Sequence, residues 1–449
     1  MRKSQQLERQ LLQHVLRTSG AEDADALLLD PVTNLPGLSA LAREVAQVLE
    51  NRNRVGILVV SIAQFSPLED VYGWEVFDEI VRGIARRLGD IKAESLRSDD
   101  ALAELSLNGN VFILMLSPPR ERRPLRASDL TRIKTRVSQK LDAYLGEVLP
   151  PDFRHRVNYF IGSGMVKRDP SVRPQRALFR TIDEALVSVK NDQDRLARRR
   201  SRRLREILAE RLITTVYQPI ADLRVRRVIG YEALSRGPDG EFVTPDVLFR
   251  VAYESELVAK LDAVCREQAV RELGRLKDNQ LLFINMEPQS IFDPRLAAAI
   301  ADDKVGSVVF EITEHAAIAD FATFRQAVHL LRRSGFHFAM DDVGSAYSGL
   351  RIIADIVPDF IKLDMELIRG AHNQRVKMEL VRAIASFCAE AGVPLIAEGI
   401  ETAEELNAMI DMGIHLVQGY LLGRPAALPG EEDIHWPATP PNSESLLSS

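Results

Sequence analysis

The sequence has 449 residues, long enough for two or more domains, and its 46% hydrophobic content is ordinary for a globular protein. A formal net charge of −6 disfavours a nucleic-acid partner. No apolar run reaches the ~18 residues of a membrane span, and the polar start of the chain lacks the apolar core of a signal peptide. Two cysteines, Cys265 and Cys388, show no metal-ligand spacing and fit a reducing compartment, so we expect a cytoplasmic protein.

The first segment, residues 1–25, has apolar residues at helical spacing. These are Leu7, Leu11, Leu12, Val15 and Leu16. The pattern predicts one N-terminal helix with Gly20 as a stop signal. It is too short for the sustained heptads of a coiled coil, so packing on its own domain is favoured over a dimerising coil or a sensor linker.

Residues 26–191 alternate helical and strand patterns, which predicts an α+β sheet domain. Strands are expected at 55–62, 101–107, 111–116 and 156–166, and helices at 74–89, at 181–190 and in segments that end near 49 and 146. The second and third strands are separated by Asn108-Gly109-Asn110. Asn-Gly between two β-type runs is a strong hairpin signal.

Several motifs of this unit stand in a familiar order. They are Asp30-Pro31-Val32-Thr33-Asn34-Leu35-Pro36, Phe65, Tyr72-Gly73, and Asp183-Glu184-Ala185-Leu186 followed by Lys190. With the order of elements, they make the unit resemble a GGDEF domain, the diguanylate cyclase fold. The Gly-Gly-Asp-Glu-Phe signature, however, reads Asn108-Gly109-Asn110-Val111-Phe112, and Ser61 and Ala63 stand at the family's acidic metal positions.

Joining two GTP molecules requires Mg²⁺, which carboxylates hold. This GGDEF-like domain is therefore expected to make no cyclic di-GMP and to act as a regulatory or dimerising scaffold, with residual GTP binding left open. Arg97-Ser98-Asp99-Asp100 resembles the family's Arg-x-x-Asp inhibitory site but lies too far from the signature. We interpret it as surface charge.

Residues 192–212 are rich in arginine, with eight between Arg195 and Arg211. Apolar residues are interleaved partly at helical spacing, which predicts an Arg-rich linker helix. RNA or acidic-membrane binding would suit such charge. The acidic balance of the whole chain favours the alternative, a solvated helix that packs one narrow apolar edge.

Residues 213–427 repeat strand and helix patterns. Strands are expected at 214–219, 228–234, 281–286, 308–313, 337–342, 360–364, 394–398 and 416–421, and helices at 245–276, 320–334, 374–392 and 402–412. Eight strands with intervening helices predict an α/β fold, a (β/α)₈ TIM-like barrel. The last segment, 428–449, is rich in Pro, Ser and Glu and is expected to be a disordered tail.

Polar residues lie at or near the ends of these strands, where such barrels carry out their chemistry. They are Glu232, Asn285, Glu311, Asp341, Asp342, Lys362, Glu398 and Gln418. A single carboxylate there could cap the next helix, but a rim of them would repel strongly without cations. Oxygen ligands without His or Cys favour Mg²⁺ or Mn²⁺, and a two-metal site of hard cations indicates phosphoryl chemistry.

The motifs around these residues extend along the whole unit. They include Tyr217-Gln218-Pro219, Glu232-Ala233-Leu234-Ser235-Arg236, Glu311-Ile312-Thr313-Glu314, Asp341-Asp342-Val343-Gly344, Lys362-Leu363-Asp364, Glu398-Gly399-Ile400-Glu401 and Gln418-Gly419-Tyr420. Residues 213–427 are similar in these motifs to an EAL domain, the cyclic-di-GMP-specific phosphodiesterase fold. The resemblance implies metal-dependent hydrolysis of cyclic di-GMP to linear pGpG.

The resemblance also assigns roles. Glu232, Asn285, Glu311 and Asp341 would hold a first Mg²⁺ or Mn²⁺, and Asp341 would bridge to a second beside Asp342. Glu398 is the candidate general base, and Lys362 would contact the attacking water or the phosphate.

Five further residues have implied roles outside the metal set. Gln218, Arg236 and Gln418 would contact the dinucleotide, and Glu314 with Glu401 would anchor the loop after the fifth strand. Asp364 is interpreted as a structural partner rather than a ligand.

The expected protein is thus an active phosphodiesterase, with a non-catalytic cyclic di-GMP receptor that signals through a protein partner as the alternative. Receptor-type EAL domains typically lose metal ligands, and this sequence keeps them. A homodimer is expected. A protein partner would bind through the GGDEF-like domain or the N-terminal helix.

Overall fold

The structure is a computed structural model that describes residues 29–30, 32–63, 66–105, 110–118, 125–148, 157–293, 296, 300, 302–313, 318, 320–344, 353, 355–428, 430 and 433–436. The chain divides into two compact units, Met1–Arg199 and Arg200–Ser449. The expected N-terminal helix lies outside the described residues. No helix in the described ranges is long and apolar enough to span a membrane.

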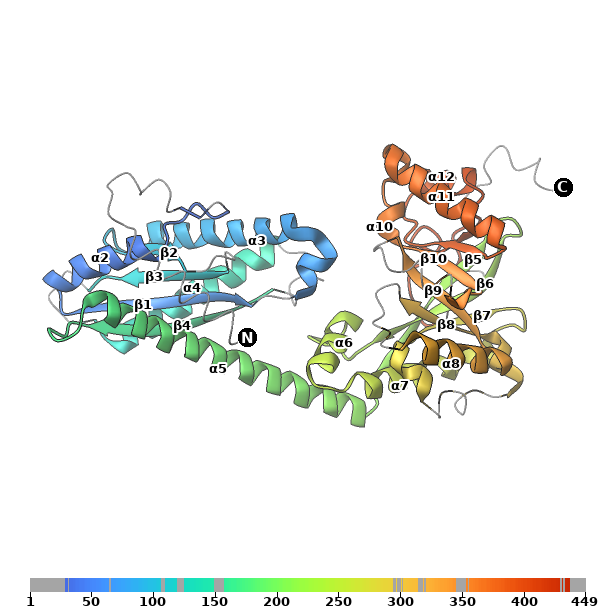
Figure 1. Cartoon of the computed structure of the whole chain (residues 1–449), viewed down its shortest axis with the longest axis horizontal. Coiled ribbons are helices and arrows are strands. Elements are labelled where there is room, and N and C mark those ends of the chain that lie inside the picture. The colour runs from blue at the N-terminus through green and yellow to red at the C-terminus, as the bar shows by residue number, and fades with distance from the viewer. Residues whose placement is uncertain are drawn as a thin grey trace. The chain divides into compact units, whose positions relative to one another are not determined.

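The first unit is built on a four-stranded antiparallel sheet of order β2-β3-β1-β4 (Figure 1). Its elements are α2 (Leu38–Asn51), β1 (Arg54–Ala63), α3 (Ser66–Ser95), β2 (Ala101–Glu104), β3 (Val111–Leu116), α4 (Ala127–Val148), β4 (Asn158–Lys167) and the start of α5 (Pro174–Ala209). The predicted hairpin is confirmed by the pairing of β2 with β3.

Strand β1 alternates between the two faces of this sheet, as period-2 patterning requires. Leu58, Val60 and Ile62 pack with α3 and α4, whereas Val55, Ile57 and Val59 pack with α2 and α5. The sheet therefore has a core on each side, and the predicted α+β unit is confirmed.

Helix α5 corrects the expected boundary at residue 191. It continues without interruption to Ala209, so no separate linker helix begins at 192. Its apolar edge, Leu204, Ile207 and Leu208, is buried with α6 (Pro245–Glu254) and α7 (Val258–Ala269). Most of its arginines are exposed, as expected of a solvated face, but Arg200 is buried and pairs with Glu241 at 2.5 Å.

The second unit contains a closed barrel of order β10-β11-β12-β5-β6-β7-β8-β9, with helices around its outside (Figure 1). The strands are β5 (Thr214–Asp222), β6 (Arg227–Arg236), β7 (Leu281–Asn285), β8 (Val308–Thr313), β9 (His337–Val343), β10 (Phe360–Leu363), β11 (Leu395–Ala397) and β12 (Leu416–Val417). Besides α6 and α7, the helices are α8 (Phe321–Arg333), α10 (Met365–Ile368), α11 (Arg375–Ala391) and α12 (Ala403–Asp411), with short 3₁₀ turns at Val270–Arg275, Pro288–Phe292, Asp302–Ser307 and Ala371–Asn373.

The barrel is confirmed, and two details differ from a uniform (β/α)₈ repeat. Strand β5 pairs antiparallel with both β6 and β12, because the short turn between β5 and β6 reverses the chain, so β5 runs opposite to its two neighbours. The helix expected at 245–276 is divided into α6, α7 and a 3₁₀ turn.

The lower interior of the barrel is filled by an apolar layer. Its members are Ile220, Phe283, Val309, Ala339, Ile396 and Leu416, one from each of six strands. Such layers make a barrel interior a packed core rather than a pore. The layer closes the barrel below the residues that were predicted to be functional.

Part of the expected disordered tail packs on the barrel. Ile434 is buried in the main core, and the backbone N–H of His435 donates to the carbonyl of Leu422. The tail prediction is therefore wrong for residues 433–436, because an apolar Ile-His-Trp run within a polar segment finds a buried site. Residues 437–449 lie outside the described residues.

Candidate functional site

The predicted polar residues form a second layer directly above the apolar one. Successive inward side chains on a strand are two residues apart. Val309 is thus followed by Glu311, Ala339 by Asp341, Ile396 by Glu398 and Leu416 by Gln418; Phe283 is followed by Asn285. On the antiparallel β5 the order is reversed, and Gln218 precedes Ile220. Strand alternation therefore brings residues from distant parts of the chain to one level.

Lys362 occupies the centre of this layer and is fully buried. Its Nζ lies 2.5 Å from Oε1 of Glu398 and 2.6 Å from Oε1 of Glu311. Oδ1 of Asp341 is 3.2 Å away and Oε2 of Glu232 is 3.4 Å away. Among the described residues, one ammonium group thus faces four carboxylates, which leaves the layer with an excess of negative charge.

Glu232 is oriented by two amides. Asn285 Nδ2 donates to its Oε1 at 3.1 Å, and Gln418 Nε2 donates to its Oε2 at 2.5 Å. Gln418 Nε2 also lies 3.1 Å from Oε1 of Gln218, whose own amide donates to the carbonyl of Gly423 at 3.2 Å. A chain of amides therefore fixes this carboxylate in one orientation.

Burial and neighbouring charges shift the pKa values of the acids in this layer in different directions. Burial raises the pKa of Glu311 and that of Glu398 well above the usual range, and the charge of Lys362 opposes this only in part. Burial also acts to raise the pKa of Glu232, but Lys362 and the amides of Gln418 and Asn285 outweigh it, so this pKa is lowered. With Lys362 as the only positive charge among the described residues of the layer, some of its acids are therefore ionised and others keep their proton.

The neighbouring aspartates behave in the same way. Burial raises the pKa of Asp341, and burial followed by the charge of Asp341 raises the pKa of Asp342 to about 7. For Lys362, burial acts to lower the pKa, but the surrounding carboxylates raise it well above its ordinary value. Lys362 therefore stays protonated, and further positive charge would be needed to ionise every acid around it.

The acids fall into two groups with metal-ligand spacing. Glu232, Glu311 and Asp341 form one, and Asp341, Asp342 and Glu398 form the other; within each group the ligand oxygens lie within 4.8 Å of one another. Asp341 belongs to both groups. This arrangement offers two adjacent cation positions that share one carboxylate.

The donor set fits divalent cations. Neither carboxylate oxygen of Glu311 accepts a hydrogen bond from the described residues, and only the ion pair with Lys362 touches Oε1. A buried oxygen without a donor is costly, and a cation would satisfy it. All the acidic ligands supply oxygen, the donor that Mg²⁺ and Mn²⁺ prefer.

Asp342 adopts a left-handed backbone conformation with φ 56°. Such a conformation is uncommon for a non-glycine residue and is found in tight turns and at functional sites. Here it lies where β9 ends, between Asp341 and Gly344. The turn directs the chain away from the barrel directly after two acids of the second group.

The structure brings together the predicted metal ligands, Lys362, Glu398, Gln218 and Gln418. It does not join Arg236 to them, since its guanidinium donates to the carbonyl of Ser235 at 2.9 Å. The carboxylate of Glu401 lies 3.2 Å from the guanidinium of Arg369. Its expected partner Glu314 and the loop after β9 lie outside the described residues, so the anchoring role stays a prediction.

One feature of the site was not foreseen. Besides the ligand contact expected of it, which stays a prediction, Gln418 is buried and orients Glu232. The signal was available, because Gln418 follows the inward-facing Leu416 by two residues. As its interpretation as a structural residue predicted, Asp364 accepts a hydrogen bond from the backbone N–H of Glu366 at 2.5 Å and caps the start of α10.

The corresponding edge of the first unit has the expected geometry without the acids. Ser61 on β1 lies opposite Val111 on β3, and the backbone N–H of Ile62 donates to the carbonyl of Asn110. These positions offer no carboxylate at the described strand ends. The interpretation of Asp100 as surface charge is wrong: it is 4% exposed and accepts the backbone N–H groups of Arg97 and Ser117 at 2.8 and 2.6 Å.

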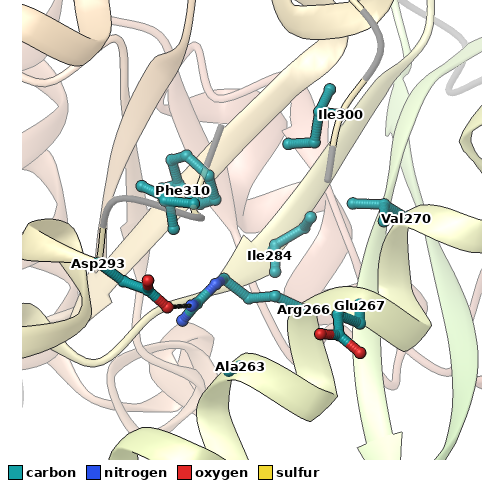
Figure 2. Close-up of a pocket in the computed structure, with 9 residues that line it drawn as sticks. Ala263, Arg266, Glu267, Val270, Ile284, Asp293, Ile300 and Phe310 are labelled. Carbon is teal, nitrogen blue, oxygen red and sulfur yellow. Dashed lines mark hydrogen bonds and ion pairs between the residues drawn. The ribbon is translucent and has the colours of Figure 1, made fainter. Parts of the chain in front are cut away.

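A cavity of about 40 Å³ lies elsewhere, outside the barrel wall (Figure 2). Arg266 of α7 faces Asp293 there, beside Ile284 and Phe310. None of the acids of the central layer lines it. The guanidinium of Arg266 is already paired with Asp262 and Asp293. We therefore do not assign the active site to this cavity.

Two protein families match the chain. Residues 27–195 match the diguanylate cyclase, GGDEF domain, and residues 201–425 match the EAL domain. The protein y4lL of Sinorhizobium fredii is 26% identical over 88% of this chain and 49% of its own length. The bifunctional diguanylate cyclase/cyclic di-GMP phosphodiesterase MucR of Pseudomonas aeruginosa is 23% identical over 94% of this chain and 62% of its own length. The chain thus spans only half to about three-fifths of these two relatives.

Solved structures include a standalone EAL protein of Vibrio cholerae in its c-di-GMP-bound form. It is 27% identical, with a TM-score of 0.44, over 52% of this chain and 97% of its own. The family matches cover both units in the order in which the sequence motifs predicted them. The chain belongs to the family of proteins in which a GGDEF domain is followed by an EAL domain.

Proposed function

We propose that the EAL barrel hydrolyses cyclic di-GMP to linear pGpG with two Mg²⁺ or Mn²⁺ ions. The observation that carries this proposal is the sharing of Asp341 by two groups of carboxylates. Two adjacent hard-cation positions are the arrangement used for in-line displacement at phosphorus. MucR, a relative named for cyclic di-GMP phosphodiesterase activity, supports the substrate class.

The residues of the layer would have different roles in binding the cations. Glu232, Asn285, Glu311 and Asp341 would hold the first cation, and Asp341 with Asp342 would hold the second. Bound cations of this kind polarise a phosphoryl group and lower the pKa of the attacking water.

The remaining polar groups would act on the substrate. Glu398 would accept the proton of the water from within the second carboxylate group, and Lys362 would keep its charge beside the phosphate. Arg236 would turn from the Ser235 carbonyl toward a phosphate, since its guanidinium can bond two oxygens at once. Gln218 and Gln418 would contact the dinucleotide from β5 and the end of β12.

The full chain tests this directly. Purified protein is stripped of metal and incubated with cyclic di-GMP, with and without Mn²⁺ or Mg²⁺, and pGpG is measured by chromatography. We expect pGpG only with the cation, and its loss in Glu232→Gln, which keeps the shape but not the charge of this ligand. Binding without pGpG would instead support the non-catalytic receptor, and full activity of Glu232→Gln would overturn the site.

We propose further that the GGDEF-like domain is catalytically inactive and serves regulation or dimerisation. Its support is the absence of carboxylates at Ser61, Asn110 and Val111. The test uses the Glu232→Gln variant, because its barrel would not hydrolyse any cyclic di-GMP that the GGDEF-like domain made. Incubated with GTP and Mg²⁺, this variant should accumulate no cyclic di-GMP, and any accumulation would contradict the proposal.

A further inference from the structure

The short helix α10 lies between two loops that carry acids of the second carboxylate group. Strand β10 is flanked by β9 and β11, and all three run parallel. The backbone N–H of Asp364 donates to the carbonyl of Val343, and that of Glu398 donates to the carbonyl of Leu363. The segment that leaves β10 is therefore held between the turn after Asp342 on one side and the turn after Glu398 on the other.

One side of α10 is packed against the turn after β9. Gly344 has φ 106°, and a Cβ at this position would collide with Cδ1 of Leu367. Leu367 is only 9% exposed. This side chain therefore occupies the space that a larger residue at 344 would need, and it fixes how closely the Asp341-Asp342 turn approaches α10.

The other side of α10 meets the turn after β11. Gly399 has φ 65°, and a Cβ there would collide with Cβ of Met365. Gly399 follows Glu398 directly, so the position of Met365 limits where this carboxylate can lie. The two contacts come from residues 365 and 367 of a single helical turn.

Several further bonds hold α10 in place. Asp364 caps its start, and Lys377 Nζ donates to the carbonyls of Glu366 at 2.7 Å and Arg369 at 3.1 Å. The guanidinium of Arg369 pairs with Glu401 at 3.2 Å, in the same loop as Glu398. The helix is thus tied to α11 and to the Glu398 loop, and it behaves as a fixed spacer.

We infer that α10, through Leu367 and Met365, sets the separation of Asp342 from Glu398 and thereby determines whether the barrel holds a second divalent cation. The two residues are positioning residues, because they touch the ligand-bearing turns and not the ligands. The inference rests on the proposed two-cation function. Loss of a group that orients metal ligands by hydrogen bonding typically changes metal affinity about 10- to 100-fold, and we expect loss of these packing contacts to act on the same scale.

The test is a titration of the metal-stripped full chain with Mn²⁺. Binding is measured by calorimetry, and the bound ions are detected by electron paramagnetic resonance. The unmodified chain should bind two Mn²⁺ and show the signal of a coupled pair. Leu367→Ala should weaken the second ion by at least about tenfold and remove the coupled signal, while leaving the first ion in place. Leu367→Met, which nearly conserves volume, should retain both ions.

Ile368→Ala is the matched control, since Ile368 is fully buried on the same helix, whereas the atoms nearest to a Cβ at Gly344 and at Gly399 belong to Leu367 and Met365. It should lower the melting temperature and keep two ions. Met365→Gly, which removes the Cβ that faces Gly399 at a 39% exposed position, tests the inference if Leu367→Ala does not fold. The inference is overturned if Leu367→Ala or Met365→Gly binds two Mn²⁺ as tightly as the unmodified chain, if Ile368→Ala loses the second ion equally, or if the unmodified chain binds only one.

Failure of the proposed function would look different. A chain that binds two Mn²⁺ but forms no pGpG would end the phosphodiesterase proposal and leave the role of α10 intact. A chain that forms pGpG while Leu367→Ala keeps both ions would do the reverse.

Discussion

The edge of the first sheet and the upper layer of the barrel can be compared pair by pair. In the sheet, Ser61 lies opposite Val111; in the barrel, Asn285 lies opposite Glu311. Both pairs lie at strand ends above a well-packed core. Only the second pair brings metal-ligating oxygens, and the difference lies in side chains that contribute little to either core.

This comparison shows that a fold persists independently of its site chemistry. The first sheet is held by alternate apolar residues of β1, which lie outside the degenerate signature at 108–112. In the barrel layer, by contrast, the side chains work against stability. The acids repel one another, and burial raises the pKa of Glu311 and of Glu398. The barrel therefore carries an energetic cost that divalent cations would relieve.

The largest expected effect is on the shared ligand. Asp341→Asn removes a charge from both carboxylate groups and should reduce pGpG formation by about 1000-fold, because cations at such sites contribute several kcal/mol. Asp342→Asn removes a charge from the second group alone and should cost only about 10- to 100-fold. Initial rates at saturating Mn²⁺ measure both. A greater loss in Asp342→Asn would contradict the shared position of Asp341.

The central ammonium should matter for stability as well as for catalysis. Lys362→Met leaves the buried acids without their one described counter-charge and should reduce the free energy of unfolding of the metal-free barrel by roughly 3–5 kcal/mol. Mn²⁺ should restore part of the loss, because it binds the folded barrel only. Denaturant unfolding with and without Mn²⁺ gives the comparison. A metal-free variant more stable than the parent would show that Lys362 does not balance the layer.

A buried acid of the first unit should respond differently. Asp100→Ala removes the acceptor of two backbone N–H groups and should destabilise that unit by about 2 kcal/mol. Neither Mg²⁺ nor Mn²⁺ should change this loss, and pGpG formation should be unaffected. The unfolding transition of the first unit and the hydrolysis rate provide the two measurements. A loss that cations reverse would make this acid a ligand after all.

Periodicity predicted the strands of both units well, because alternation depends only on which face is buried. Alternation does not indicate the direction of a strand, so it does not predict that β5 is antiparallel to its neighbours. The few residues between Asp222 and Arg227 leave room only for a hairpin and do indicate this. Asp100 was misread because nothing periodic marks a turn acid as buried. The rim of polar residues followed from strand ends and the proposed ligand roles from the resemblance to EAL domains. The contacts of α10 with Gly344 and Gly399, by contrast, are long-range packing that no local pattern encodes.

The smallest expected effect is a pH dependence confined to the first unit. Burial, with the nearby charge of Asp30, raises the pKa of Glu104 to about 7, although Thr33 donates to its carboxylate at 2.5 Å and acts to lower the pKa. Between pH 4.5 and 7 the folded unit therefore holds a proton that the unfolded chain has released. Stability must then fall as pH rises through this window, by at most about 1.4 kcal/mol per pH unit for one proton, and level off above it.

Glu104→Gln removes the titrating group and should flatten this slope while leaving the barrel's transition unchanged. The free energy of unfolding of the first unit, measured by denaturant at several pH values between 5 and 8, gives the slope for both proteins. Because Glu104 is only 4% exposed, the amide of glutamine replaces a neutral carboxylic acid of the same shape, so the variant should match the parent at pH 5 and exceed it at pH 8. Equal slopes in the two proteins would mean that the Glu104 carboxyl is ionised in the folded unit, with Thr33 as its principal partner.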